Sequence, residues 1–558
     1  MPKSMNKPAK SSPPKLGGTG GGLPSPLHTA DLLDLIARLG EGQQYQLRRI
    51  ELAYNLKTEY HISALRGLID QYRYRLSAQS VGSVKRVGDG VAIVSGLRGV
   101  MVDELVLFPD GTYGLALDLD HHYVGCVLLG TDEDIHAGDI VKGTGQVIDV
   151  PVGESLLGRV VNALGQPIDD LGPLEAPEKI VRRPIDCRAP TFIQRAPVSE
   201  PLQTGIKAVD SVIPLGRGQR ELIIGDRQIG KTAIAVDTVI NQRDQGVYCI
   251  YICIGQKMST VAQIVETFRE HETLDYTTVI VASAEEPPSM VYLAPYAGCA
   301  MAEAFMYAGR HALIVYDDLS KHAIAYRQLS LLLQRPAGRE AYPGDIFYLH
   351  SRLLERSARL SAAYGGGSMT ALPIVETQAG NIAAYIPTNL ISITDGQIYL
   401  TTQLFNQAIR PAIDVGLSVS RVGGAAQNNA MRTVSRHLAL DIAQFLELQI
   451  FARFGTELDR ATREQLARGE RVRAILTQPQ YEPMPVAHQV VVIYAAGQGY
   501  LDDVPIEQVH SFEARLLNFL QQQCSGLLAE FSTGHWNPQL EQDLQNALAR
   551  FKEYVWRS

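Results

Sequence analysis

Two features are missing from this chain, and each absence excludes a class of protein. No stretch of about 18 apolar residues occurs, so the sequence predicts no membrane-spanning helix. Excess positive charge is also missing, because 59 Asp and Glu outnumber 51 Lys and Arg. The resulting net charge of −8 provides no general attraction for nucleic acid or an anionic membrane. The N-terminus carries lysines without an apolar core, so we expect no secretory signal.

Cysteine is sparse as well. The six cysteines are scattered, with no histidine cluster beside them, at positions 126, 187, 249, 253, 299 and 524. Cys249 and Cys253 lie in an apolar run that is typical of a buried strand. We therefore expect reduced thiols in a cytosolic protein, and neither a disulfide framework nor a cysteine metal site.

The chain is long enough for two to four domains: it has 558 residues, of which 46% are apolar and 20% charged. Residues 1–28 are rich in Pro, Gly, Ser and Lys and predict a disordered basic tail. Residues 29–80 have helical apolar spacing and predict a helical N-terminal extension. Whether those helices pack on this chain or on a partner stays open.

The remaining pattern changes twice. Short apolar runs separated by Gly and Pro turns predict a small β-barrel over residues 81–150. Apolar strands then alternate with helical stretches, which predicts a RecA-like α/β P-loop domain with a parallel sheet over residues 151–430. Helical spacing returns after Met431, so residues 431–558 are expected to form an α-helical C-terminal domain.

The strongest local motif is a complete G-x-x-x-x-G-K-T sequence between a short apolar strand and a helical run. Its glycines allow backbone N–H groups to point inward at phosphates, its lysine can reach the β and γ phosphates, and its threonine can bind Mg²⁺. These features predict a site for a magnesium nucleotide. The predicted binding residues are Gly225, Asp226, Arg227, Gln228, Ile229, Gly230, Lys231 and Thr232.

A second contact to the metal is expected where the strand Leu313–Tyr316 runs into two acids. We assign Asp317, the first acid after the strand, as the residue that holds Mg²⁺ through water. The alternative for such an acid is a helix N-cap, and that role suits Asp318 better than Asp317.

The residue that would activate water for hydrolysis is expected after the strand Val247–Ile254, where the chain has Gln256. An amide can orient water but cannot accept its proton. Glu285 and Glu286, after another apolar strand, could in principle substitute, but a solvated loop is the favoured interpretation of these two acids. The residues alone leave hydrolysis open.

Several longer motifs resemble the α chains of F-type ATP synthases. The matching segments are 205–211, 216–222, 255–257, 316–321, 335–336, 338–345, 350–356, 387–389, 392–397 and 418–423, and the likeness runs from about Val81 to Tyr500. The resemblance implies an α₃β₃ ring around a central-stalk γ subunit, a peripheral stalk, and a membrane sector that moves H⁺ or Na⁺. It also implies a peripheral location on the cytoplasmic face of the bacterial inner membrane.

By the same resemblance, this chain's own site holds Mg-ATP or ADP without turning it over. The residues implied to surround the adenine and ribose are Phe405, Arg410, Gln478 and Gln480. Arg421 is implied to be an arginine finger that reaches a neighbouring β-subunit site, with Ser418 and Ser392 shaping that interface. Without the resemblance, a structural salt bridge would be the simpler interpretation of Arg421.

Two departures from the family pattern concern the N-terminal 80 residues and the short link Tyr364–Ser368, and they suggest a divergent form of the synthase. The main competing hypothesis is a self-sufficient hexameric P-loop ATPase such as an RNA translocase. The acidic net charge and the absence of a basic, aromatic-rich stripe argue against it, so we expect no nucleic-acid partner. An ATPase of a protein-export apparatus would require a glutamate where Gln256 stands.

Overall fold

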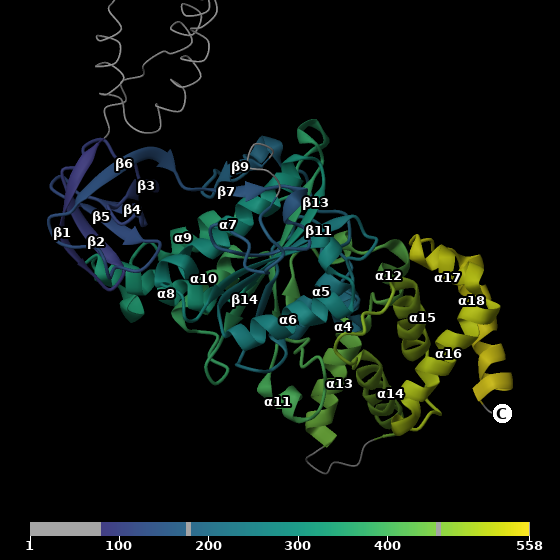
Figure 1. Ribbon diagram of the computed structural model, residues 1–558. Coiled ribbons are helices and arrows are strands. Elements are labelled where there is room, and N and C mark those ends of the chain that lie inside the picture. The colour runs from purple at the N-terminus through teal and green to yellow at the C-terminus, as the bar shows by residue number, and fades with distance from the viewer. Residues whose placement is uncertain (1–79, 175–179, 453–458, 557–558) are drawn as a thin grey trace, which may run out of the picture. The chain divides into compact units, whose positions relative to one another are not determined.

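The computed structural model describes residues 80–174, 180–452 and 459–556 (Figure 1). The predicted tail (1–28) and the predicted helical extension, apart from Ser80, lie outside these residues. Three parts follow along the described chain: a strand-rich part, a central sheet with helices, and a set of C-terminal helices. The expected fold class is therefore confirmed.

The first part is a closed six-stranded barrel in the order β1-β2-β5-β4-β3-β6. Alternating side chains along the strands fill its interior, among them Val84, Val94 and Cys126. Its strands are β1 (Val81–Gly88), β2 (Val91–Ser95), β3 (Glu104–Leu107), β4 (Tyr113–Leu119), β5 (Val124–Leu128) and β6 (Ile140–Val147). A two-stranded sheet of β7 (Asp149–Val152) and β9 (Val181–Pro184) follows it.

The central sheet has eight strands in the order β16-β15-β10-β14-β13-β11-β12-β8. All neighbours pair in parallel except β15 and β16, which are antiparallel. The predicted parallel sheet therefore carries one antiparallel edge strand. The strands are β8 (Val160–Asn162), β10 (Leu222–Gly225), β11 (Val247–Gln256), β12 (Thr277–Ser283), β13 (His311–Asp317), β14 (Ser368–Glu376), β15 (Gly396–Tyr399) and β16 (Val419–Ser420).

Helices cover both faces of this sheet, which explains why its strands are apolar almost without interruption. Successive residues of β11 show the arrangement, because Tyr251 packs in one core and Ile252 in the other. The first core contains α5 (Lys231–Ile240) and α6 (Met258–Glu270). The second contains α7 (Pro288–Tyr307), α8 (Leu319–Leu332), α9 (Ile346–Leu354) and α10 (Tyr385–Ile393).

The C-terminal helices continue the first core. A buried ion pair between Lys207 on α4 (Lys207–Val212) and Glu513 joins them to the nucleotide domain. In the described part of the chain, no helix has both the length and the apolarity needed to cross a membrane. The remaining helices are α11 (Thr402–Asn406), α12 (Asn429–Val434), α13 (Leu438–Ala452), α14 (Arg460–Leu476), α15 (Val486–Gly497), α16 (Val509–Gln523), α17 (Ser525–Ser532) and α18 (Pro538–Phe551).

A fully buried pair of histidines joins α8 to α9. His322 Nε2 lies 3.2 Å from the carbonyl oxygen of Tyr292, so this nitrogen carries the proton and donates. His322 Nδ1 then accepts from His350 Nε2 at 3.3 Å, and His350 Nδ1 has no hydrogen-bond partner. Burial lowers the pKa of His350 from 6.5 to about 4, and it lowers the pKa of His322 well below its usual range.

This pair predicts acid lability. Because the folded state resists protonation, the unfolded chain binds more protons between pH 6.5 and 4, and stability falls as the pH drops through that window. For His350 the loss by pH 5 is on the order of 2 kcal/mol. Thermal unfolding midpoints at pH 7.5 and 5 measure it, and His350→Gln should reduce the difference. His121→Gln, at an exposed position, should leave it unchanged; an equal reduction in both variants would contradict this explanation.

Candidate nucleotide site

The predicted phosphate loop lies between the end of β10 and the start of α5. Its backbone is left-handed at Gln228 (φ 60°) and at Gly230 (φ 99°), the residue that precedes the helix. A β-carbon on Gly225 would lie 2.7 Å from the carbonyl oxygen of Leu400, so only glycine fits there without displacing the neighbouring strand end. The loop therefore has the curled shape that directs N–H groups toward an anion.

Lys231 is buried at the base of this loop, with 8% of its surface exposed. Its ammonium group donates to the carbonyl oxygen of Gly225 at 2.8 Å and to that of Asp226. Burial lowers the pKa of Lys231, and the negative charges of Glu376, Asp318 and Asp317 oppose the shift. A cation held this close to the loop is available to a phosphate group.

Asp226 braces the loop from outside. Its carboxylate accepts from Thr377 Oγ1 at 2.7 Å, from the Gly380 N–H at 2.8 Å and from Thr402 Oγ1 at 2.9 Å. Burial opposes ionisation of Asp226, but these hydrogen bonds lower its pKa on balance. Asp226 is thus engaged in holding the loop, whereas the neighbouring Arg227 is exposed.

The predicted metal contacts meet at the end of β13. Thr232 Oγ1 donates to Asp317 Oδ2 at 2.9 Å, and the Tyr251 hydroxyl donates to the same oxygen at 2.8 Å. Burial, followed by repulsion from Asp318, raises the pKa of Asp317 to about 6. Asp318 is the N-cap of α8 and accepts from the Lys321 N–H at 2.9 Å, so the two adjacent acids have different roles.

Gln256 is the last residue of β11, which is two residues longer than the predicted strand Val247–Ile254. Its amide nitrogen donates to the backbone carbonyl of Asp317 at 3.4 Å, so the side chain lies beside the expected metal contact. Of the two acids considered as substitutes, Glu286 turns back and accepts from the Ser283 N–H at 3.3 Å. Gln256, whose amide cannot accept a proton, therefore lies beside Asp317 at this edge of the sheet.

A cavity of ≈ 420 Å³ opens beside the loop. That volume falls within the range typical of small-molecule sites. The four residues predicted for adenine and ribose all line it: Phe405, Arg410, Gln478 and Gln480. The Arg410 guanidinium lies 4.8 Å from the centroid of the Phe405 ring, which is within cation–π range. The cavity also contacts Gln228, Ile229 and Gly230, so phosphate loop and cavity are continuous.

Gln478 lines this cavity, but its side-chain oxygen and nitrogen are already hydrogen-bonded within the chain. Its side-chain oxygen accepts from the Lys207 N–H at 3.0 Å, and its nitrogen donates to the carbonyls of Gly205 and Glu482. Asp237, which sequence reasoning missed, also lines the cavity and accepts from the Tyr481 N–H at 2.7 Å. Burial raises its pKa to about 6.

Arg421 follows β16 at the amino end of β15, whereas Ser418 precedes β16 and lies beside Tyr399, at the carboxyl end of β15. The Ser418 hydroxyl is engaged within the chain, since it donates to the carbonyl of Asp414 at 2.6 Å and accepts from the Tyr399 N–H at 2.9 Å. Arg421 is exposed, and its guanidinium makes no hydrogen bond or ion pair with any residue that the structure describes. The structure thus places Arg421, but not Ser418, at the end of the sheet opposite to the phosphate loop.

Three family models match these three parts in order. The beta-barrel domain of the ATP synthase alpha/beta family matches residues 78–145, the nucleotide-binding domain matches residues 205–420, and the C-terminal domain matches residues 427–551. A protein named ATP synthase subunit alpha, from Caldanaerobacter subterraneus subsp. tengcongensis, is 56% identical over 499 residues, which cover 89% of this chain and 98% of that protein. The chain belongs to the ATP synthase alpha/beta family. The near-complete match to an alpha subunit identifies it as an alpha-type chain.

Within this ATP synthase family, the site predicts nucleotide binding that depends on two separable contacts. Lys231→Ala should weaken ATP binding to the isolated chain by roughly 10- to 100-fold, the usual effect of losing a charged hydrogen bond. Thr232→Ala and Asp317→Asn should mainly reduce the gain in affinity that Mg²⁺ provides. Titration with a fluorescent ATP analogue, with Mg²⁺ or EDTA, measures both effects.

The exposed Lys142 on the barrel supplies the control, since Lys142→Ala should change neither quantity. Unchanged ATP affinity in Lys231→Ala would contradict the assignment of the phosphate loop.

Proposed function

We propose that this chain is the alpha subunit of an F-type ATP synthase head, that it holds Mg-ATP without hydrolysing it, and that it lends Arg421 to a neighbouring beta-type subunit. The observation that carries the proposal is that two sets of polar groups lie at opposite edges of the sheet, the edge where the parallel strands end and the edge where they begin. At one edge a complete phosphate loop lies beside an amide, Gln256. At the other edge the exposed Arg421 guanidinium makes no hydrogen bond or ion pair with the described residues.

The donors around Asp317 fit a magnesium ion. Mg²⁺ prefers oxygen ligands and keeps several waters, so it needs few protein groups besides the phosphates. The Thr232 hydroxyl and the Asp317 carboxylate, 2.9 Å apart, supply that chemistry. The described residues contain no cluster of three His, Cys, Asp or Glu that would form an all-protein cage, as expected for such a site. When bound, Mg²⁺ neutralises phosphate charge and fixes the geometry of the β and γ phosphates.

The role of Gln256 follows from its chemistry. Water attacks a phosphoryl group fastest when a neighbouring base takes its proton. Gln256 has no basic atom, and its amide nitrogen already donates to the Asp317 carbonyl. The site therefore retains ATP and supports a regulatory or structural role.

Arg421 has the properties that a group acting in another subunit requires. Its backbone is held, because its N–H donates to the Asp395 carbonyl at 2.9 Å, while its side chain extends into solvent. A guanidinium offers paired donors to the charge that develops on γ-phosphoryl oxygens, an effect on the order of 10³-fold or more in rate. A residue that acted in the nucleotide site of its own chain would instead lie beside the phosphate loop.

In the assembled enzyme, we place this chain in an α₃β₃ ring with the γ subunit and a peripheral stalk. The ring would lie at the cytoplasmic face of the bacterial inner membrane and couple ATP chemistry to H⁺ or Na⁺ transport by a membrane sector.

The test is steady-state ATP hydrolysis by the complex with a co-expressed beta-type chain. Arg421→Ala should lower kcat by about 10³-fold without preventing assembly. Lys231→Ala should have a much smaller effect, because it alters only the site that does not turn over.

Arg432, which lies on α12, 11 residues after Arg421, provides a matched control. Arg432→Ala should retain most of the activity. Full activity in Arg421→Ala, or a comparable loss in both arginine variants, would overturn the finger assignment.

A further inference from the structure

The segment that carries Arg421 has little secondary structure of its own. β16 contains only Val419 and Ser420, and it pairs with a single neighbour, β15, through two residue pairs. A two-residue edge strand cannot by itself fix the direction of the following side chain. Another set of contacts must therefore hold Arg421 in place.

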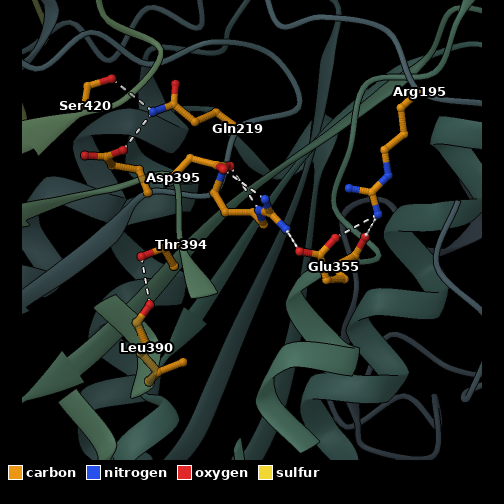
Figure 2. A network of polar contacts seen from close by, with 9 residues as sticks. Arg195, Gln219, Glu355, Leu390, Thr394, Asp395 and Ser420 are labelled. Atoms are coloured by element: carbon orange, nitrogen blue, oxygen red, sulfur yellow. Dashed lines mark hydrogen bonds and ion pairs between the residues drawn. The ribbon is translucent and has the colours of Figure 1, made fainter. Parts of the chain in front are cut away.

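Ser420, immediately before Arg421, is the centre of those contacts. Its hydroxyl donates to the Pro214 carbonyl at 2.8 Å and accepts from the Gly423 N–H at 3.2 Å. It also accepts from the side-chain amide of Gln219 at 3.1 Å (Figure 2). One hydroxyl thus fixes the turn on both sides of Arg421.

Gln219 is fully buried, and each end of its amide is engaged. Its oxygen accepts from the Gly216 N–H at 2.8 Å, and its nitrogen bridges Ser420 Oγ and Glu221 Oε2, the latter at 2.8 Å. An amide is the one neutral side chain that can donate to both oxygens and accept a backbone N–H at the same time. The orientation of Gln219 is therefore determined by its surroundings.

Glu221, one of the two acceptors of this bridge, is fully buried, and its Oε1 atom has no hydrogen-bond partner. Burial and the charge of Asp395 raise the pKa of Glu221 well above its usual range, although the charge of Arg421 and the Gln219 hydrogen bond act in the opposite direction. Burial therefore disfavours the charged form of this carboxyl, which weakens its attraction for the Arg421 guanidinium. A β-carbon at Gly396 would lie 2.6 Å from Glu221 Oε2 and 2.2 Å from the Val419 carbonyl, so β16 is packed tightly on this carboxyl.

Arg220, which lies between Gln219 and Glu221 in the chain, also supports the backbone at Arg421. The Arg220 guanidinium donates to both oxygens of Asp395, and the Asp395 carbonyl accepts the Arg421 N–H. Figure 2 shows Asp395 beside Gln219, with Glu355 and Arg195 extending the contacts away from Ser420. Gln219 contacts Ser420, and Arg220 contacts Asp395, which accepts the Arg421 N–H. Both supporting residues lie immediately before β10, the strand that leads to the phosphate loop.

We propose that Gln219 is a positioning residue for Arg421: its buried amide, bridging Glu221 and Ser420, sets the direction in which the guanidinium extends toward the neighbouring subunit. The inference rests on the proposed function of Arg421. The physical reason is that a displacement of about 1 Å at a catalytic group can lower a rate by roughly 100-fold, whereas assembly tolerates it.

The test uses the complex with the beta-type chain and the variant Gln219→Met, which keeps the length of the side chain but removes the amide. It should lower kcat for Mg-ATP hydrolysis by about 10- to 100-fold, with KM changed less than about twofold. In the Arg421→Ala background, Gln219→Met should lower the single-turnover rate by less than about twofold. The reason is that Gln219 acts through Arg421, so the two substitutions disrupt the same interaction.

Gln489 provides the matched control. It is also a fully buried glutamine whose amide bridges two acceptors, Asp210 Oδ2 and the Met484 carbonyl, but it lies on α15. Gln489→Met should give the same fold-change in both backgrounds. Ser420→Ala removes the acceptor of the bridge and decides by the same criteria if Gln219→Met fails to assemble.

The outcomes separate the two proposals. An unchanged kcat in Gln219→Met, or an equal loss with and without Arg421, would overturn the positioning role while the finger stands. An unchanged rate in Arg421→Ala would overturn both.

Discussion

The parallel pairing of β11 with β13 is the constraint on which the nucleotide site depends. It aligns Cys253 with Asp317, so both strands end at the same edge, and β10 ends there too in the same sheet. Because the carboxyl ends of parallel strands collect at one edge, the phosphate loop, Asp317 and Gln256 meet although they are far apart in the chain. The buried Tyr251 hydroxyl and Thr232 then hold the Asp317 carboxylate between them. The same pairing places the Gln256 amide beside Asp317, and the proposal that this site retains its nucleotide rests on that arrangement.

The antiparallel edge strand has the opposite effect. β16 reverses direction relative to β15, so the chain reaches Arg421 at the amino ends of the parallel strands, opposite to the phosphate loop. One sheet thus carries the phosphate loop and its cavity at one end and the exposed Arg421 at the other. The proposed contribution of this chain to a neighbour's chemistry rests on this division. β10 connects the two edges, since Gln219–Glu221 precede it and Gly225 ends it.

Sequence reasoning succeeded where local pattern determines structure. The glycine spacing of the loop, the apolar strands and the acid after Leu313–Tyr316 were sufficient to predict the sheet and to place the loop and Asp317 at the ends of its strands. Resemblance was needed for Phe405, Arg410 and Gln480, because their approach to α5 depends on how distant segments pack. Asp237 and Tyr251 were missed since each lies within an apolar run and resembles a core position. The network around Gln219 could not be predicted for a different reason, because its partners lie up to 201 residues away in the sequence.

The central claim is that this chain binds ATP and leaves it intact. The most direct measurement is to incubate the isolated chain with radiolabelled Mg-ATP, separate the bound nucleotide, and determine the proportion of ATP and ADP over time. We predict that bound nucleotide remains ATP for many minutes in the isolated chain, while the complex with the beta-type chain produces ADP. Stoichiometric ADP in the pocket of the isolated chain would contradict the account.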